Sequence, residues 1–304
     1  MPDRPLEFVK AYGLDSGLDC TWWQLATGSV NRWTGLYAGT QGQTCMIWLL
    51  AIQLAVGPVQ HYQNAKQDFT QRRFSEAVGE VDAALQENPY MVQALVLKAR
   101  LATVARRPDV AKSCLITAIM VDPGSEEAQF YLGVLFYTQN DFKSAISPLE
   151  TAQTLSPRNP LPVFYLAMTH EALGDEAKGL ALYQQAENLS PQKSPESAEI
   201  FVANGRFLLS LGRTEDGIEK DRQAIGIDPG SRDAHYELAK GLDHQGDFKD
   251  AAREGELALT LPGGDASDPQ IHFLLAALYR KLNEPDLAKA HMEKFLAAPK
   301  TPHR

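Results

Sequence analysis

Six alanines recur along this chain at a nearly constant spacing. Successive members are separated by 34, 34, 34, 38 and 34 residues, and a proline lies five residues after each of the first five. The six are Ala84, Ala118, Ala152, Ala186, Ala224 and Ala258. A repeat of this length indicates a unit that cannot bury its apolar face alone and must stack on its neighbours. The chain is therefore predicted to fold as an array of one repeated unit.

Two further sets of small residues share this spacing. One set lies seven residues before those alanines, and the other lies twelve residues earlier again. The nearer set is Ala77, Ala111, Ala145, Gly179, Gly217, Ala251 and Ala288, and the farther set is Ala65, Ala99, Gly133, Ala167, Gly205, Ala239 and Ala276. Seven residues make about two helical turns, so small side chains share one helix face and let a second helix approach closely. Each unit is predicted to be two tightly packed helices.

A chain reversal is predicted between the two small residues of each unit. Five residues before the second, five units carry a glycine or an asparagine, which tolerate the left-handed conformation that ends a helix. These residues are Asn140, Gly174, Gly212, Gly246 and Asn283. Arg72 and Arg106 hold this place in the first two units and fit it poorly. Between units, Asp-Pro-Gly-Ser at 122–125 and 228–231 predicts a helix end followed by a serine cap. No segment reads as a strand.

The third unit matches a known family pattern best. It carries Leu132, Gly133, Phe136, Ala145, Leu149, Ala152 and Pro157 in places that resemble the tetratricopeptide repeat, whose signature is W-x2-L-G-x2-Y, then A-x3-F, then P. The resemblance covers about 58–302, divided into 58–91, 92–125, 126–159, 160–193, 198–231, 232–265 and 269–302. It implies an all-α, right-handed superhelical solenoid of about seven helix-turn-helix repeats. A helical array of another family is the alternative.

Three residues depart from this pattern inside the predicted second helices. Pro148 removes a backbone donor and predicts a kink or an early break, since proline costs roughly 3 kcal/mol in an ideal helix. Asp221 and Gly255 stand where the other units have an apolar residue. The second helices of the fifth and sixth units are therefore expected to pack less well.

The first 57 residues lie outside the repeat. Residues 1–45 show no sustained period and are expected to be a poorly ordered extension or a gene-model artefact. Residues 46–57 form a twelve-residue run without charge, too short to span a bilayer but suited to the apolar region of a secretory signal. The alternative is a hydrophobic helix that caps the first repeat. Export is slightly favoured over a cytoplasmic location, and membrane association would occur only through an uncleaved 46–57.

The search for chemistry favours a protein that is not an enzyme. A net charge of −9 and a pI near 5.3 argue against a nucleic-acid partner, which needs a clustered basic surface. No nucleophile elbow, zinc-protease motif or phosphate loop occurs, so no catalytic residue, cofactor or metal is predicted. His61, His235 and His272 occupy the same place in three units, which favours a structural role over a metal site.

Binding is the predicted function, because stacked helix pairs form an extended inner surface. In the family that this chain resembles, the first helix of each unit lines that surface. There the aligned residues form an aromatic and apolar row, bordered by cations four residues later on the same face. The candidate groove residues are Tyr62, Lys66, Arg100, Phe130, Phe164, Met168, Arg206, Tyr236, Lys240 and Phe273. The expected partner is a protein or peptide with apolar anchors and acidic groups. The alternative, favoured for any single residue, is structural packing and solvated surface.

The predicted function is therefore a non-enzymatic protein-interaction scaffold that binds a peptide or protein segment in the concave groove. The main alternative is an exported or membrane-held accessory factor in cell-envelope assembly or secretion. An enzyme with a site in the groove is a distant third. The lysine and asparagine clamp with which some members of the family hold chaperone tails is not reproduced here, so that ligand is not predicted.

Overall fold

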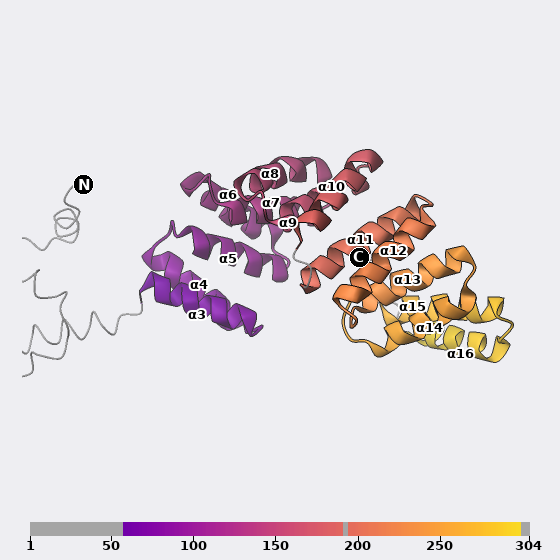
Figure 1. The fold of residues 1–304 in the computed structure, drawn as a ribbon. Coiled ribbons are helices and arrows are strands. Elements are labelled where there is room, and N and C mark those ends of the chain that lie inside the picture. Colours follow the sequence, from indigo (N-terminus) through magenta and orange to yellow (C-terminus); the bar gives the residue numbers. More distant parts are fainter. Residues whose placement is uncertain (1–56, 191–193, 299–304) are drawn as a thin grey trace, which may run out of the picture. The chain divides into compact units, whose positions relative to one another are not determined.

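The computed structural model describes residues 57–190 and 194–298 (Figure 1). Within these ranges every regular element is an α-helix and no strand occurs. The helices are α3 (Pro58–Thr70), α4 (Phe74–Glu87), α5 (Val92–Val104), α6 (Pro108–Val121), α7 (Glu126–Thr138), α8 (Phe142–Leu155), α9 (Pro160–Ala172), α10 (Glu176–Leu189), α11 (Pro195–Ser210), α12 (Thr214–Ile227), α13 (Arg232–Gln245), α14 (Phe248–Thr260), α15 (Asp268–Lys281) and α16 (Pro285–Ala297).

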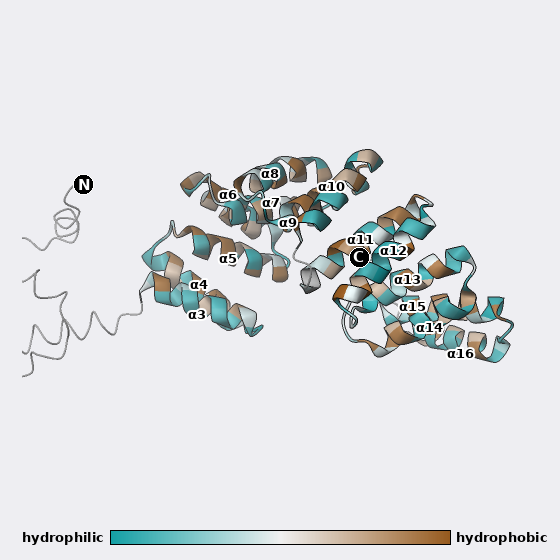
Figure 2. Cartoon of the chain, in the orientation of Figure 1, coloured by the Kyte–Doolittle hydropathy of each residue, from teal (hydrophilic) through white to brown (hydrophobic). Residues whose placement is uncertain are grey.

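The helices pack in consecutive pairs, from α3 with α4 to α15 with α16, and each second helix also packs against the first helix of the next pair. We call each pair a unit. Apolar and polar residues are interspersed along all the helices (Figure 2), so the core is distributed through the array and not held by one element. This arrangement confirms the predicted all-α solenoid of helix-turn-helix units.

The small residues lie where two helices approach most closely. In the first unit Ala65, Ala77 and Ala84 are 0 % exposed. In the third unit a β-carbon on Gly133 would stand 2.4 Å from Cγ of Leu149 on the paired helix. No larger side chain fits there without displacing its neighbour, which is why the sequence keeps small residues at these places.

The turns inside the units have one backbone conformation whatever residue occupies them. Their residues all have positive φ, as predicted for the glycines and asparagines but not for the two arginines: Arg72, Arg106, Asn140, Gly174, Gly212, Gly246 and Asn283 have φ of 58°, 56°, 59°, 76°, 76°, 93° and 62°. The two arginines therefore adopt the left-handed conformation despite the steric cost of their β-carbons. The geometry of the unit prevails over the preference of the residue.

The two Asp-Pro-Gly-Ser segments form the predicted stop and cap. Asp122 follows the end of α6 and its Oδ1 accepts a hydrogen bond from Gly124 N at 3.0 Å. The Ser125 side chain then accepts from Ala128 N at 3.3 Å and caps α7. Ser231 caps α13 in the same way through Ala234 N, also at 3.3 Å.

The expected early break at Pro148 and the expected poor packing of α12 and α14 are wrong. Helix α8 runs unbroken through Pro148, because packing against both α7 and α9 holds it together although proline donates no backbone hydrogen bond. A kink there stays a prediction. Helices α12 and α14 are also well packed on both sides. Asp221 is 0 % exposed opposite the small Gly205, and the Leu275 side chain fills the space beside Gly255.

The predictions for 1–45 and for the apolar run 46–57, except Gly57, fall outside the described residues. Gly57 precedes α3, whose first residue is Pro58. Among the helices that the structure describes, none is both long and apolar enough to cross a bilayer.

Candidate functional site

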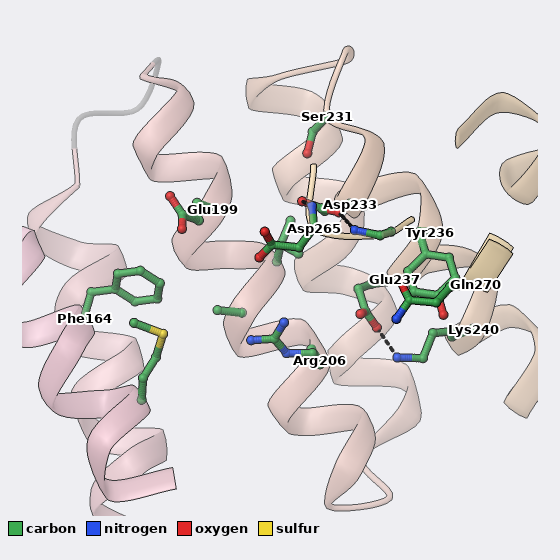
Figure 3. A pocket seen from close by; sticks show the side chains of 14 residues that line it. Phe164, Glu199, Arg206, Ser231, Asp233, Tyr236, Glu237, Lys240, Asp265 and Gln270 are labelled. Carbon is green, nitrogen blue, oxygen red and sulfur yellow. Dashed lines mark hydrogen bonds and ion pairs between the residues drawn. The ribbon is translucent and has the colours of Figure 1, made fainter. Parts of the chain in front are cut away.

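A cavity of about 520 Å³ lies between α9, α11 and α13 (Figure 3). It occurs where the neighbouring first helices α9 and α11 have less contact than any other such pair among the described helices. Helix α11 has 16 residues and is the longest helix described. The cavity is lined by Phe164, Met168, Glu199, Val202, Ala203, Arg206, Ser231, Asp233, Tyr236, Glu237, Lys240, Asp265, Ala266 and Gln270.

The side formed by α9 and α11 is mostly apolar, with one cation, Arg206, and one carboxylate, Glu199. Phe164 is 3 % exposed and belongs to a core cluster that α9, α10 and α11 share, with Met168 packed against that cluster. Figure 3 shows Phe164 on α9 and Arg206 on the neighbouring helix α11, and both line this part of the cavity. Arg206 is exposed and forms no ion pair or hydrogen bond with any residue that the structure describes. A cation beside an apolar surface can bind a carboxylate that follows an apolar side chain.

The side formed by α13 holds a cation that is already neutralised. Lys240 Nζ donates to Glu237 Oε2 at 2.6 Å and lies 5.4 Å from the centre of the Tyr236 ring. Glu237 is only 6 % exposed, so this ion pair is shielded from water on the carboxylate side. Lys240 is thus less available to a ligand than Arg206.

A carboxylate fixes the loop that borders the cavity. Asp233 Oδ1 accepts from Ala266 N and its Oδ2 accepts from Asp265 N, each at 2.8 Å. Asp233 and Asp265, together with Glu199 and Glu237, give the cavity four carboxylates against two cations. Asp233 and Glu237 lie on α13 and Asp265 lies in the loop before α15, so three of the four carboxylates belong to the α13 side of the cavity, whereas Glu199 lies on α11 (Figure 3).

Asp221 lies behind this cavity, on α12, and is completely buried. Neither carboxylate oxygen has a hydrogen-bond partner among the described residues. Burial raises the pKa of Asp221 to about 9, with a further contribution from Glu237, while Lys240 and Arg206 act in the opposite direction. The side chain is therefore a neutral acid at pH 7.

Half of the ten predicted groove residues meet in this cavity: Phe164, Met168, Arg206, Tyr236 and Lys240. Tyr62 lines a second cavity, of about 710 Å³, bordered by α3, α5 and α7. Lys66 is exposed and lines neither cavity. The ten residues therefore do not gather in one cavity.

The other three candidates line neither cavity and contact residues within the array. Arg100 lies between two rings, 4.6 Å from the centre of Phe69 and 4.9 Å from that of Tyr131. Phe130 is 8 % exposed and packs on Tyr131 and Tyr165. Phe273 is 53 % exposed and lies 5.2 Å from the ring centre of Phe295.

Sequence reasoning missed the polar residues of the cavity. Glu199, Asp233 and Gln270 hold the second place in three consecutive units, three residues before the aromatic row. Residues three apart share a helix face, so this second row was a readable signal. Asp265 lies in a loop, and no period predicts its position.

The three equivalent histidines bind within their own units. His61 contacts Glu80, His235 contacts Glu254 and His272 contacts His291, each nineteen residues later on the paired helix. No cluster of three metal-ligating side chains occurs in the part of the chain that the structure describes.

The family models that match this chain share one description. Two models described as tetratricopeptide repeat match residues 96–160 and 269–301. A curated relative, a DnaJ homolog subfamily C member 7 homolog from Dictyostelium discoideum, is 23 % identical over 199 residues, which are 62 % of this chain and 37 % of the relative. The chain thus spans little more than a third of that relative.

Solved structures of low identity share the fold. A chain of the APC/C hetero-tetramer Cut9–Hcn1 aligns with a TM-score of 0.66 and 16 % identity, over 78 % of this chain and 46 % of that one. A thermophilic TPR protein from Thermus thermophilus aligns with a TM-score of 0.53 and 22 % identity, over 61 % of this chain and 99 % of that one.

Proposed function

This chain is a tetratricopeptide repeat protein, a class that serves as scaffolds for protein interactions, and we propose that it binds a partner segment in the cavity between α9, α11 and α13. The proposal rests on the position and the free charge of Arg206. It is an exposed guanidinium without an ion pair in the described structure, and it borders the same cavity as Phe164 and Met168. Binding without catalysis is the function that this arrangement supports best.

The partner segment carries an apolar residue next to a carboxylate. The apolar side chain packs on Phe164 and Met168, where its burial contributes about 25 cal/mol for each Å² removed from water. The carboxylate accepts hydrogen bonds from the Arg206 guanidinium, a charge-assisted contact that also fixes its direction. Both contacts lie on one side of the cavity, so they favour a compact recognition motif.

The opposite side of the cavity selects against further acidic residues. Glu237 already neutralises Lys240, and Asp233 and Asp265 add negative charge to the lining. A second carboxylate at that end would meet like charges, which costs affinity. The cavity therefore orients the partner, with its acidic group toward Arg206 on α11 and a neutral or basic group toward α13.

The first test is a comparison of proteins that co-purify with the chain from its native host. Arg206→Glu reverses the unpaired charge, whereas Arg222→Glu makes the same change on the exposed face of α12, away from the cavity. Circular dichroism must show that both variants are as helical as the unchanged chain. Loss of a partner from the Arg206 variant alone supports the proposal, and its retention by both variants contradicts it.

A second step identifies the chemistry of the captured partner. Peptides that tile its sequence are titrated by fluorescence anisotropy against the unchanged chain. The proposal expects the tight binders to contain an apolar residue followed by a carboxylate, and expects removal of that carboxylate to weaken binding about tenfold or more, since a hydrogen bond to a charged group contributes about 1.5–3 kcal/mol. Binding that does not depend on the carboxylate would reject Arg206 as the anchor.

A second candidate function rests on the uncharged run at 46–57. If that run directs export, the scaffold acts in assembly or secretion at the cell envelope. Mass spectrometry of the amino terminus of the protein from its native host distinguishes the two, because export by a cleaved signal removes the apolar run together with the residues before it. An intact amino terminus favours the cytoplasm.

A further inference from the structure

One pair of positions links the two helices of a unit in the first, sixth and seventh units. The fourth residue of the unit contacts the residue nineteen places later on the second helix. In the first unit His61 Nδ1 lies 2.6 Å from Glu80 Oε2, and in the sixth His235 Nδ1 lies 2.7 Å from Glu254 Oε2. The seventh unit differs because both members of the pair are histidines.

His272 on α15 and His291 on α16 meet through like atoms. Their Nδ1 atoms are 3.0 Å apart, and their ring centres are 5.1 Å apart. At that distance one nitrogen must carry the hydrogen and the other must accept it. The contact therefore requires at least one unprotonated Nδ1.

Charged groups from three helices surround the pair. Glu256 on α14 has its Oε1 at 3.0 Å from His291 Nε2, and Tyr279 on α15 donates to the same carboxylate at 3.1 Å. Lys294 on α16 is a positive charge near both histidines. Asp268 on α15 is the remaining nearby charge, and it is bound by Arg232.

A first and a second proton have different effects on this cluster. With one extra proton, His291 can donate to Glu256 through Nε2 and to His272 through Nδ1, so both contacts survive. With two, both Nδ1 atoms carry hydrogens at a separation of 3.0 Å, the hydrogen bond is lost, and two cations meet beside Lys294. His291 is only 6 % exposed, so water screens this repulsion poorly.

We propose that the seventh unit is an acid-sensitive element, in which double protonation of His272 and His291 detaches α16 from α15 while the first and sixth units stay closed. In those units a protonated histidine faces a glutamate, so acid adds an ion pair instead of a repulsion. Helix α16 also has no following helix to hold it among the described residues. Its release uncovers the face of α15 that carries Ala276, which is 2 % exposed.

The direction of the pH dependence follows from the two histidines. Burial lowers the pKa of both below the usual value of 6.5, and the mutual repulsion of the rings lowers that of His272 further. A folded-state pKa below the unfolded one means that the unfolded state binds protons first. The stability contribution of the pair is therefore complete above about pH 6.5 and is lost as the pH falls below it.

The test is hydrogen exchange of the full chain, followed by mass spectrometry between pH 7.5 and 5 and corrected for intrinsic exchange rates. As the pH falls, peptides from α16 should lose protection relative to peptides from α4. The loss should be about tenfold for each unit by which the pKa values of the two histidines are lower in the folded state than in the unfolded state. His291→Gln keeps a polar group for Glu256 but cannot be protonated, so it should abolish the loss.

A matched variant creates the same response in another unit. Glu254→His gives the sixth unit two facing histidines, with His235 as the existing member, and should make α14 acid-sensitive while α4 is unchanged. Unaltered protection of α16 at pH 5 in the unchanged chain would overturn the proposal. The same loss in the His291→Gln variant would overturn it too, because the response would not depend on the histidine pair.

Discussion

The carboxylate of Asp221 lies directly over Gly205: a β-carbon built on that glycine would stand 2.5 Å from Asp221 Oδ1. The same two places hold Gly133 and Leu149 in the third unit, where the glycine makes room for an apolar side chain. In the fifth unit it makes room for a buried acid. The close approach of α11 and α12 therefore depends on the absence of a side chain at Gly205.

Gly205→Ala is expected to lower the free energy of unfolding by about 1–3 kcal/mol, because the added methyl group overlaps Asp221 and the backbone oxygen of Gly217. Urea unfolding followed by circular dichroism measures the change. Gly79→Ala in α4 is the control, since an added β-carbon there meets nothing within 4 Å. The control should gain about 0.5–1 kcal/mol from the better helix propensity of alanine.

Asp221→Asn should stabilise the chain increasingly as the pH rises. The pKa of Asp221 is raised to about 9 in the folded state, above its usual value of 3.8, so its contribution is fully present below about pH 3.8 and is lost as the pH rises through 9. The variant has no such loss. Between pH 5 and 8 its advantage should grow by up to about 1.4 kcal/mol per pH unit. Parallel curves of melting temperature against pH for the two proteins would contradict this.

Arg106→Gly should raise the free energy of unfolding by about 0.5–1 kcal/mol. Arg106 has a φ of 56°, a conformation in which its β-carbon crowds the backbone and glycine does not. The reverse change, Gly174→Arg, places an arginine at the same point of the fourth unit, where φ is 76°, and should cost a similar amount. Thermal unfolding of both variants measures the change in the free energy of unfolding. Changes of similar size and opposite sign would show that the backbone conformation of the turn accounts for the effect.

Glu187→Ala should weaken the junction between the fourth and fifth units. Glu187 Oε1 accepts from Asn204 Nδ2 and Oε2 from Lys220 Nζ, each at 2.6 Å, so one carboxylate of α10 binds both α11 and α12. Its removal leaves the buried Asn204 amide unpaired and should cost about 2–3 kcal/mol. Calorimetry should then resolve two transitions. Glu219→Ala, which removes an exposed glutamate, should leave a single transition.

The period of the sequence predicted the fold because each unit repeats the same backbone geometry. The turn at Arg106 shows how far this goes, since the reversal forms even where the residue disfavours it. The period could not predict which aligned residues stay available. Phe130 and Arg100 hold the same places as Tyr236 and Arg206, but contacts with neighbouring units cover the first two. Such differences arise from pairs of residues in different units, which no single-unit pattern contains.

Asp221 illustrates the same limit in the core. Its charge suggested a weak helix, yet the structure buries it completely, because Gly205 supplies the space and a raised pKa keeps it neutral. The sequence of the fifth unit contains both residues. Their contact could be inferred only by aligning the glycine with Gly133 and the acid with Leu149.

Helix α11 has less contact with the preceding unit than any other first helix has among the described units, and we therefore expect this junction to yield first under load. Under tension applied to its two ends, an array of stacked helix pairs elongates first where the fewest contacts resist separation. We expect optical tweezers to record an early, reversible extension that Glu187→Ala brings to lower force. A pulling load would therefore widen the cavity before any helix unfolds. The affinity for a segment bound there would then fall as the load increases.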